Sequence, residues 1–298
     1  MKLYGVIPPM VTPFAEDGAV DFTGLDILVD YLSDHVDGLF VCGSYGSGPL
    51  MDAGERKAVA AASIRKSAGR VPVIVHTGSA SSREAADLSA HAAASGAAAV
   101  GAVAPYYFHY SGDCVVDYYR TILKAVPKGF PVYVYHNPRF SGYEIDMKTI
   151  TRLAELGIAG VKDATFDMAK FSAYQRDLAP KGLDIVLGTE SLWLSARALG
   201  AEAFIPGLAN AFPELCRKLH RQGMANDIES CRASQFLVNK IRDLMYMAGS
   251  TQQAVYAMLE IRGIVKCYPR SPFLPADTAS VESLRSALRS LGVLDAAS

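Results

Sequence analysis

Lys162 and Tyr135 each place a reactive side chain at the end of a short apolar segment. Lys162 follows "GIAGV" (157 to 161), and Tyr135 lies in "PVYVYHN" (131 to 137). Burial disfavours the charged form of a lysine and lowers its pKa, and a neutral amine can attack a ketone to form a Schiff base. A tyrosine with a hydroxyl partner can relay a proton. We therefore predict Lys162 as the nucleophile, Tyr135 as the proton relay and Ser44 as the hydroxyl partner.

The segment "GSYGSG" (43 to 48) is rich in glycine, so we expect it to turn backbone N–H groups into the site. Such groups bind the carboxylate of a 2-oxo acid without an arginine. The GK[ST] ending of a phosphate-binding loop is missing. Each feature also has a structural interpretation, since Lys162 could pair with Asp163 and Tyr135 could pack on a half-buried strand. Chemistry is favoured because all of these residues fall at the same end of successive predicted strands.

Short β-rich segments alternate with alanine-rich amphipathic segments about every 25 to 35 residues, a spacing typical of βα units. Eight strands are predicted, over residues 4–10, 38–43, 71–77, 98–105, 131–137, 159–163, 184–188 and 203–207. A helix is predicted after each strand, over residues 22–34, 53–68, 82–95, 113–126, 146–156, 167–178, 190–199 and 212–222. Eight such units close into a (β/α)8 TIM barrel over residues 1–224, with its catalytic groups at the carboxyl ends of the strands. Residues 225–298 have helical periodicity without strands and are predicted to form a small C-terminal helical extension.

The chain has 298 residues, half of them hydrophobic, and a net charge of −1. It offers no basic face for nucleic acid or acidic membranes, so small molecules are the expected partners. Prolines interrupt the apolar part of "MKLYGVIPPMVTPF", which indicates a cytoplasmic protein. The five cysteines are scattered without a CxxC pair, so we expect reduced thiols, mostly in the core.

No cofactor is predicted, because no GxGxxG opens a helix after the first strand. The six histidines show no HxxxH or HExxH spacing, so no metal site is predicted. His76 and His136 fall at predicted strand ends, where we expect a structural or hydrogen-bonding role. A metal-dependent barrel lyase stays open as an alternative, and so does a barrel that binds a 2-oxo acid without turnover.

Six segments along nearly the whole chain carry a resemblance: "GVIPPMVTPF", "GLFVCGSYGSGPLMDAGER", "APYYF", "YHNP", "GVKDAT" and "RSPFLP". On these segments the chain resembles the dihydrodipicolinate synthase/N-acetylneuraminate lyase family of class I pyruvate aldolases. The resemblance implies a (β/α)8 barrel with a C-terminal helical extension, usually a homotetramer built as a dimer of dimers. It implies that Lys162 forms the Schiff base and that Tyr135 relays protons. Ser44 would complete the relay with Tyr107, which each subunit inserts into the site of its neighbour.

The resemblance also implies a set of substrate-binding residues. Backbone N–H groups of Ser44 and Tyr45, in the loop that begins at Gly43, would bind the carboxylate of the 2-oxo acid. Further residues would lie near the rest of the pocket: Gly188, Glu190 and Ile205. The family's motif in this loop usually reads Gly-Thr/Ser-Thr-Gly-Glu, whereas here Tyr45 replaces a small hydroxyl residue and Ser47 replaces the glutamate.

A second departure concerns the aldehyde partner. Dihydrodipicolinate synthases carry an arginine five residues after the relay tyrosine, and this chain has Phe140 there. Arg139 is a substrate-binding candidate, but we expect it to point elsewhere if the strand register continues. Tyr45, Phe140 and Trp193 should make the second-substrate pocket apolar. We therefore predict a lyase or aldolase whose aldehyde is not aspartate semialdehyde, with 4-hydroxy-tetrahydrodipicolinate synthase and a 2-keto-3-deoxy sugar acid aldolase or dehydratase as alternatives.

Overall fold

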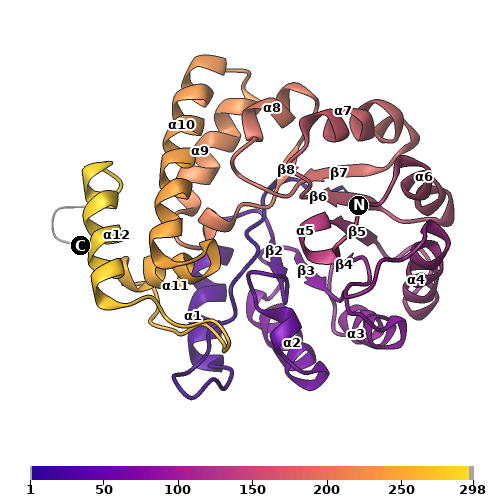
Figure 1. The fold of residues 1–298 in the computed structure, drawn as a ribbon, viewed down its shortest axis with the longest axis horizontal. Helices are drawn as coiled ribbons and strands as arrows, with labels where there is room; N and C mark the ends of the chain where they lie inside the picture. Colours follow the sequence, from indigo (N-terminus) through magenta and orange to yellow (C-terminus); the bar gives the residue numbers. More distant parts are fainter. Residues whose placement is uncertain (1, 295–298) are drawn as a thin grey trace.

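Eight parallel strands form a ring at the centre of the molecule. The computed structural model describes residues 2–294, and its strands are β1 (Gly5–Val6), β2 (Leu39–Val41), β3 (Val73–His76), β4 (Ala99–Val103), β5 (Val132–His136), β6 (Gly160–Asp163), β7 (Asp184–Leu187) and β8 (Ala203–Phe204). Strands β2 to β8 pair in sequence order, and β8 pairs with β1. A parallel bridge between Pro9 and Phe40 joins β1 to β2 and closes the ring. The predicted (β/α)8 barrel is therefore confirmed (Figure 1).

Helices surround the ring at nearly the predicted positions. They are α1 (Phe22–Ser33), α2 (Ala53–Ser67), α3 (Ser82–Ala94), α4 (Gly112–Ala125), α5 (Pro138–Ser141), α6 (Met147–Leu156), α7 (Met168–Asp177), α8 (Trp193–Ala198) and α9 (Pro213–Met224). Four single turns of 3-10 helix lie at Gly48–Leu50, Ala179–Lys181, Gly207–Asn210 and Tyr246–Ala248. The short helix α5 was not predicted. It begins where the Asn137 side chain accepts a hydrogen bond from the Arg139 N–H and Pro138 occupies the first turn, both of which favour a helix start.

The segment that carries Lys162 enters the barrel through a glycine. Gly157 ends α6 with φ of 106°, in the left-handed region that glycine adopts without a Cβ clash. The chain then turns into β6, where Lys162 pairs with Tyr135 of β5. Asp163 pairs with His136 one position further along. Because side chains alternate along a strand, Lys162 and Tyr135 face the barrel axis together while the other two face the helices.

The barrel interior below these two residues is a packed hydrophobic layer. Its members are Leu3, Ile7, Phe40, Ile74, Ala99, Tyr133, Val186, Ala203 and Ile205. Val103, Tyr135 and Ala164 form a smaller layer toward the carboxyl ends of the strands. Phe40 connects the two layers, since its ring contacts Tyr135 edge-on at a centroid distance of 6.2 Å. The rings of Phe40 and Tyr135 therefore form the bottom of the cavity that lies at the carboxyl ends of the strands.

Residues after α9 form the predicted helical extension, with α10 (Ile228–Met245), α11 (Thr251–Ile261) and α12 (Thr278–Ser290). One continuous hydrophobic core joins these helices to the barrel helices, from Leu25 in α1 to Leu288 in α12. Figure 1 shows α10 alongside α9, with α11 reaching toward the barrel. All five cysteines are free, and all but Cys114 are buried, as predicted. Within residues 2–294, no helix has the length and apolar character needed to cross a bilayer.

Candidate active site

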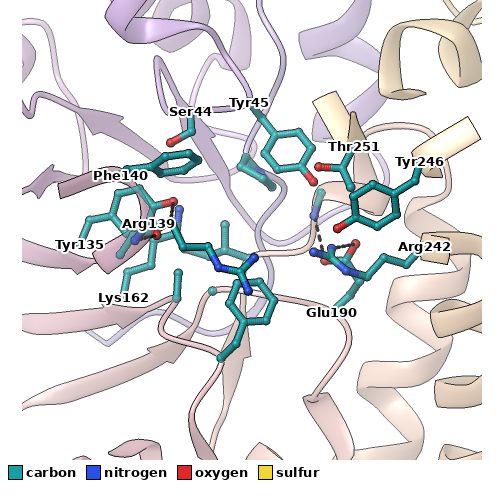
Figure 2. Close-up of a pocket in the computed structure, with 17 residues that line it drawn as sticks. Ser44, Tyr45, Tyr135, Arg139, Phe140, Lys162, Glu190, Arg242, Tyr246 and Thr251 are labelled. Atoms are coloured by element: carbon teal, nitrogen blue, oxygen red, sulfur yellow. Dashed lines mark hydrogen bonds and ion pairs between the residues drawn. The ribbon is translucent and has the colours of Figure 1, made fainter. Parts of the chain in front are cut away.

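A cavity opens at the carboxyl ends of the strands, where the sequence placed the chemistry (Figure 2). Nine of the predicted site residues line it: Ser44, Tyr45, Tyr135, Arg139, Phe140, Lys162, Gly188, Glu190 and Ile205. Gly43 and Tyr107 do not. The lining also includes residues that the sequence did not indicate: Pro9, Asn137, Ala164, Phe166, Gly207, Arg242, Tyr246 and Thr251.

Lys162 is a buried amine among aromatic rings. It is 5% exposed, and its Nζ lies 4.0 Å from the ring centroid of Phe40 and 3.8 Å from that of Tyr135. Within residues 2–294 no carboxylate pairs with it, and the Asp163 side chain instead accepts a hydrogen bond from the Thr165 N–H. Burial without a counter-charge lowers the pKa of Lys162 to about 7. A large fraction of the amine is therefore neutral and nucleophilic near neutral pH.

Tyr135 presents its hydroxyl beside this amine. The Asn137 side-chain amide donates a hydrogen bond of 3.0 Å to the Tyr135 hydroxyl. Burial raises the pKa of Tyr135, while hydrogen bonds from Asn137 and Ser44 act in the opposite direction by favouring the phenolate. The hydroxyl is consequently protonated at neutral pH yet surrounded by groups that can share its proton. That combination suits a proton relay.

The loop after β2 is held from several sides. Thr12 donates a hydrogen bond to the Gly46 carbonyl, and Gln252 of α11 donates one of 2.8 Å to the Ser44 carbonyl. The N–H groups of Ser44 and Tyr45 have no acceptor within the described residues. Two unpaired backbone donors at the edge of the cavity can bind a carboxylate. Gly43 lies beside Phe40, and a Cβ at this position would lie 2.8 Å from the Phe40 ring, so the close packing here requires glycine.

The wall opposite Lys162 is built around a buried carboxylate. Glu190 is 1% exposed and accepts hydrogen bonds from the N–H groups of Gly207 (3.2 Å) and Leu208 (3.3 Å). Arg242 of α10 donates to the same carboxylate at 3.1 Å. The helical extension also supplies Tyr246 and Thr251, whose hydroxyl lies beside that of Tyr45 (Figure 2). No sequence signal marked these three, because nothing local distinguishes them from surface residues of amphipathic helices.

On the aldehyde side of the site, the candidate Arg139 lies at the cavity, whereas the expectation that Trp193 lines it is wrong. Arg139 lines the cavity, with its guanidinium 4.8 Å from the ring centroid of Phe166, because α5 replaces the extended register assumed for it. Trp193 lies outside the cavity, in the core. Its ring stacks on Phe204 at a centroid distance of 4.7 Å, and its Nε1 donates to the Leu219 carbonyl. Phe140 is half exposed and lines the rim of the cavity, as predicted for a residue of the second-substrate pocket.

Tyr107 is not brought to the cavity of its own chain. Its side chain is 85% exposed and stacks edge-on against Phe108, which is 61% exposed. Its φ is 83°, a left-handed conformation that is uncommon outside glycine. An exposed aromatic pair on a constrained turn is available for contact with another molecule.

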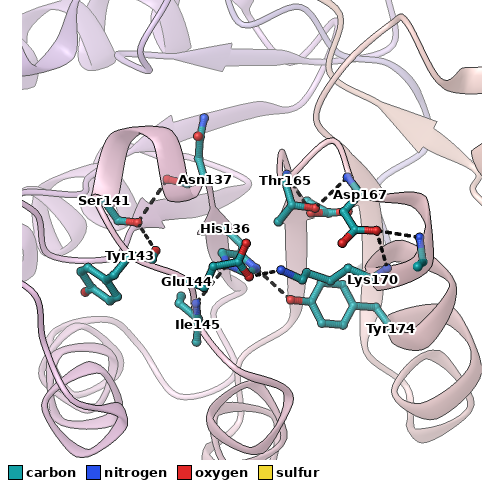
Figure 3. Close-up of polar contacts among 12 residues, drawn as sticks. His136, Asn137, Ser141, Tyr143, Glu144, Ile145, Thr165, Asp167, Lys170 and Tyr174 are labelled. Atoms are coloured by element: carbon teal, nitrogen blue, oxygen red, sulfur yellow. Dashed lines mark hydrogen bonds and ion pairs between the residues drawn. The ribbon is translucent and has the colours of Figure 1, made fainter.

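The two strand-end histidines make structural hydrogen bonds, as predicted. His76 accepts from the Val103 N–H through Nε2, and His136 accepts from the Ile145 N–H through Nε2 while its Nδ1 contacts the Tyr174 hydroxyl at 2.8 Å (Figure 3). Burial lowers the pKa of His136 to about 3, so its ring is neutral. Over the described part of the chain, no three His, Cys, Asp or Glu side chains cluster as metal ligands would.

The low pKa of Lys162 predicts a pH-dependent stability. The folded pKa of about 7 lies below the ordinary 10.5, so between these pH values the unfolded state binds more protons and stability rises with pH. Below pH 7, where Lys162 is charged in the folded state, the loss of stability caused by its burial reaches its full value. We expect Lys162→Met to be more stable than the parent by a few kcal/mol at pH 6, at about 1.4 kcal/mol per pKa unit.

Urea unfolding of both proteins from pH 6 to 9.5 measures this effect. The advantage of the variant should shrink steadily as the pH rises. An advantage that is constant across this range would mean that packing, and not charge burial, separates the two proteins.

Comparisons with known proteins agree with this geometry. The dihydrodipicolinate synthetase family matches residues 2–291. An uncharacterized DapA-like lyase of Halobacterium salinarum is 35% identical over 99% of this chain and 96% of its own length. A 4-hydroxy-tetrahydrodipicolinate synthase of Sorangium cellulosum is 31% identical over 98% and 97%, respectively. Among solved structures, a prophage protein of the dihydrodipicolinic acid synthase family from Escherichia coli, in complex with pyruvate, superposes with a TM-score of 0.92 at 26% identity, covering 98% of this chain and 99% of that one.

Proposed function

The chain belongs to the dihydrodipicolinate synthetase family of lyases and aldolases, and we propose that it forms a Schiff base between Lys162 and pyruvate or another 2-oxo acid. The observation that carries the proposal is the state of Lys162. This amine is buried without a carboxylate partner, its pKa is lowered to about 7, and it lies against Tyr135 in the cavity. The related prophage protein in complex with pyruvate supports the choice of 2-oxo acid.

The reaction follows from these groups. The 2-oxo acid carboxylate binds the N–H groups of Ser44 and Tyr45, and the Lys162 amine attacks C2. Loss of water leaves an iminium ion, and removal of a proton from C3 gives an enamine. C3 of the enamine bonds to the aldehyde carbon while the aldehyde oxygen takes a proton. Water then releases the product and restores the amine, and cleavage runs through the same steps in reverse.

Tyr135 moves the protons in this scheme. Its hydroxyl accepts a hydrogen bond from Asn137 and can exchange protons with Ser44. Tyr107 of the partner subunit completes the relay. The exposure of the Tyr107 and Phe108 rings supports this role, as does a mostly apolar cavity of about 260 Å³ beside Ser44 and Tyr106 that could receive them. The enzyme is accordingly a homo-oligomer. Its resemblance to the family implies a tetramer, and its N-terminal sequence predicts a cytoplasmic location.

Trapping with borohydride tests this function. Purified protein incubated with pyruvate and borohydride should gain the mass of one reduced pyruvate adduct per chain, on the peptide that contains Lys162. Absence of an adduct would refute the Schiff-base reaction. An adduct without turnover of any aldehyde would favour the alternative of a barrel that binds a 2-oxo acid without catalysis.

The aldehyde partner is a separate question. The prediction that the aldehyde is not aspartate semialdehyde depended on Phe140 at the arginine position and on an apolar pocket formed by Tyr45, Phe140 and Trp193. In the structure Trp193 lies outside the cavity and Arg139 lines it, so the cavity is less apolar than expected. Tyr45 and Phe140 still give the cavity an apolar side. The charged groups on the cavity wall opposite Lys162, around Glu190 and Arg242, therefore decide which aldehydes fit.

A further inference from the structure

We propose that Gln252 of α11 is a positioning residue for the 2-oxo acid, because it orients the peptide unit whose N–H group, that of Tyr45, binds the substrate carboxylate. The inference rests on the proposed function and adds to it a residue of the helical extension. The Gln252 side-chain amide donates a hydrogen bond of 2.8 Å to the Ser44 carbonyl. Ser44 and Tyr45 border the cavity that contains Lys162 (Figure 2), whereas Gln252 lies outside its lining. Gln252 therefore acts through the loop.

The Ser44 carbonyl and the Tyr45 N–H belong to one peptide unit. This unit is planar and trans, so its C=O and N–H bonds point in opposite directions. A hydrogen bond that holds the carbonyl toward Gln252 therefore holds the N–H away from Gln252. That N–H has no acceptor within the described residues, which leaves it for a ligand. The same hydrogen bond polarises the peptide unit and strengthens the N–H as a donor.

The loop needs such support because two of its buried residues hold an unfavourable backbone conformation. Cys42 and Ser47 have φ of 57° and 54°, in the left-handed region that is uncommon outside glycine. Residues in this region persist only where the surrounding structure holds them. Within the loop, the Ser44 carbonyl also accepts a hydrogen bond from the Ser47 N–H, at 3.2 Å. Gln252 thus supplies the shorter of the two hydrogen bonds to this carbonyl.

One face of α11 holds the loop at two places. Tyr256 lies four positions after Gln252, on the same face of the helix. Its hydroxyl donates a hydrogen bond of 2.9 Å to the Thr12 carbonyl, and the Thr12 hydroxyl donates one of 2.7 Å to the Gly46 carbonyl. Tyr256 therefore supports the later part of the loop through Thr12. Of these two supports, only Gln252 contacts the peptide unit that presents the carboxylate-binding N–H.

Gln252 is also placed where water can be excluded from its amide. It lines the mostly apolar cavity of about 260 Å³ that would receive the exposed rings of the partner subunit, and Ser44 lines both cavities. A ring in this second cavity would cover the partly buried amide. A hydrogen bond shielded from water is stronger than an exposed one. Loss of the Gln252 amide should therefore be measurable in pyruvate binding.

Gln252→Met tests the proposal, since methionine has a similar length and no hydrogen-bond donor. Half-maximal borohydride trapping should need about 3- to 15-fold more pyruvate than in the parent, the effect expected from one hydrogen bond. KM for pyruvate should rise by a similar factor. At saturating pyruvate, kcat should change by less than about twofold, because Lys162 and Tyr135 are unaltered. Trapping with acetone, a ketone without a carboxylate, should proceed at the parent rate.

Gln253→Met is the matched control. Gln253 is the next residue of α11, and its amide donates a hydrogen bond to the Leu274 carbonyl, away from the loop. This variant should match the parent with both ketones. Gln252→Glu is a second loss variant, which keeps the size and shape of the side chain but has no N–H donor. It should also need more pyruvate for half-maximal trapping, and it keeps the test decisive if Gln252→Met does not fold.

The outcomes separate this inference from the proposed function. Absence of a pyruvate adduct in the parent protein would refute the Schiff-base reaction, and this inference with it. If the parent forms the adduct and the Gln252 variants bind pyruvate as tightly as the parent, only the positioning role is overturned. It is also overturned if trapping with pyruvate and with acetone falls alike, because Gln252 would then support the whole cavity and not the carboxylate site.

Discussion

Lys162→Met should form no borohydride-trapped adduct with pyruvate and should lose aldol cleavage and condensation by roughly 10⁴-fold or more. No other group in the cavity can replace its amine, because the remaining basic lining residues are arginines, which stay protonated. Methionine fills a similar volume between Phe40 and Tyr135, so the fold should persist. Intact-mass measurement and a pyruvate-release assay report the two losses.

Lys170→Met is the matched control for this experiment. Lys170 is also partly buried, but it lies on α7, outside the cavity, and pairs with Glu144 (Figure 3). The control should keep both adduct and activity. In the parent protein, adduct formation should accelerate as the pH rises through about 7, because deprotonation converts the Lys162 ammonium group into the neutral, nucleophilic amine. An adduct on another lysine in Lys162→Met would contradict the assignment.

Tyr135→Phe should lower kcat by about 10²- to 10⁴-fold, the usual contribution of a positioned acid or base. The phenyl ring keeps its contacts with Lys162 and Phe40, so only the proton-transferring hydroxyl is lost. Binding of the 2-oxo acid should change little, because in the proposed mechanism its carboxylate binds the backbone N–H groups of Ser44 and Tyr45. Steady-state kinetics with the preferred aldehyde measures both parameters. A rise in KM at unchanged kcat would show that the hydroxyl binds substrate and relays no proton.

Tyr133→Phe offers a control on the same strand. Tyr133 lies two residues earlier, and its hydroxyl donates a hydrogen bond of 2.8 Å to buried Asp184, away from the cavity. This variant should lose about 1.5 to 3 kcal/mol of stability, because the lost hydrogen bond is to a carboxylate, and should keep its kcat. If both variants lose kcat alike, the effect of Tyr135→Phe would come from the strand and not from the hydroxyl.

Local sequence pattern was sufficient to predict the barrel and the position of Lys162 beside Tyr135 at its rim. The alternation of β-rich and amphipathic segments encodes βα units, and parallel strands of such a barrel end at one rim. A lysine or tyrosine at a strand end therefore lies at that rim whatever the details of packing. The same reasoning placed Ser44 at this rim, and the family resemblance added Gly188 and Glu190; all three line the cavity. It did not predict the direction of the Arg139 side chain, because one turn of helix follows Asn137 and a single turn shows no periodicity in the sequence.

By itself, the sequence determined the closed barrel, the helical extension and the position of Lys162 beside Tyr135, since the hydrophobic pattern and its periodicity are local properties of a chain. Only the tertiary structure decided what faces this pair across the cavity. Arg242 meets Glu190 across 52 positions and Gln252 meets Ser44 across 208, through the packing of α10 and α11 on the barrel. Contacts between such distant segments depend on how whole helices pack, and no short stretch of sequence specifies that packing.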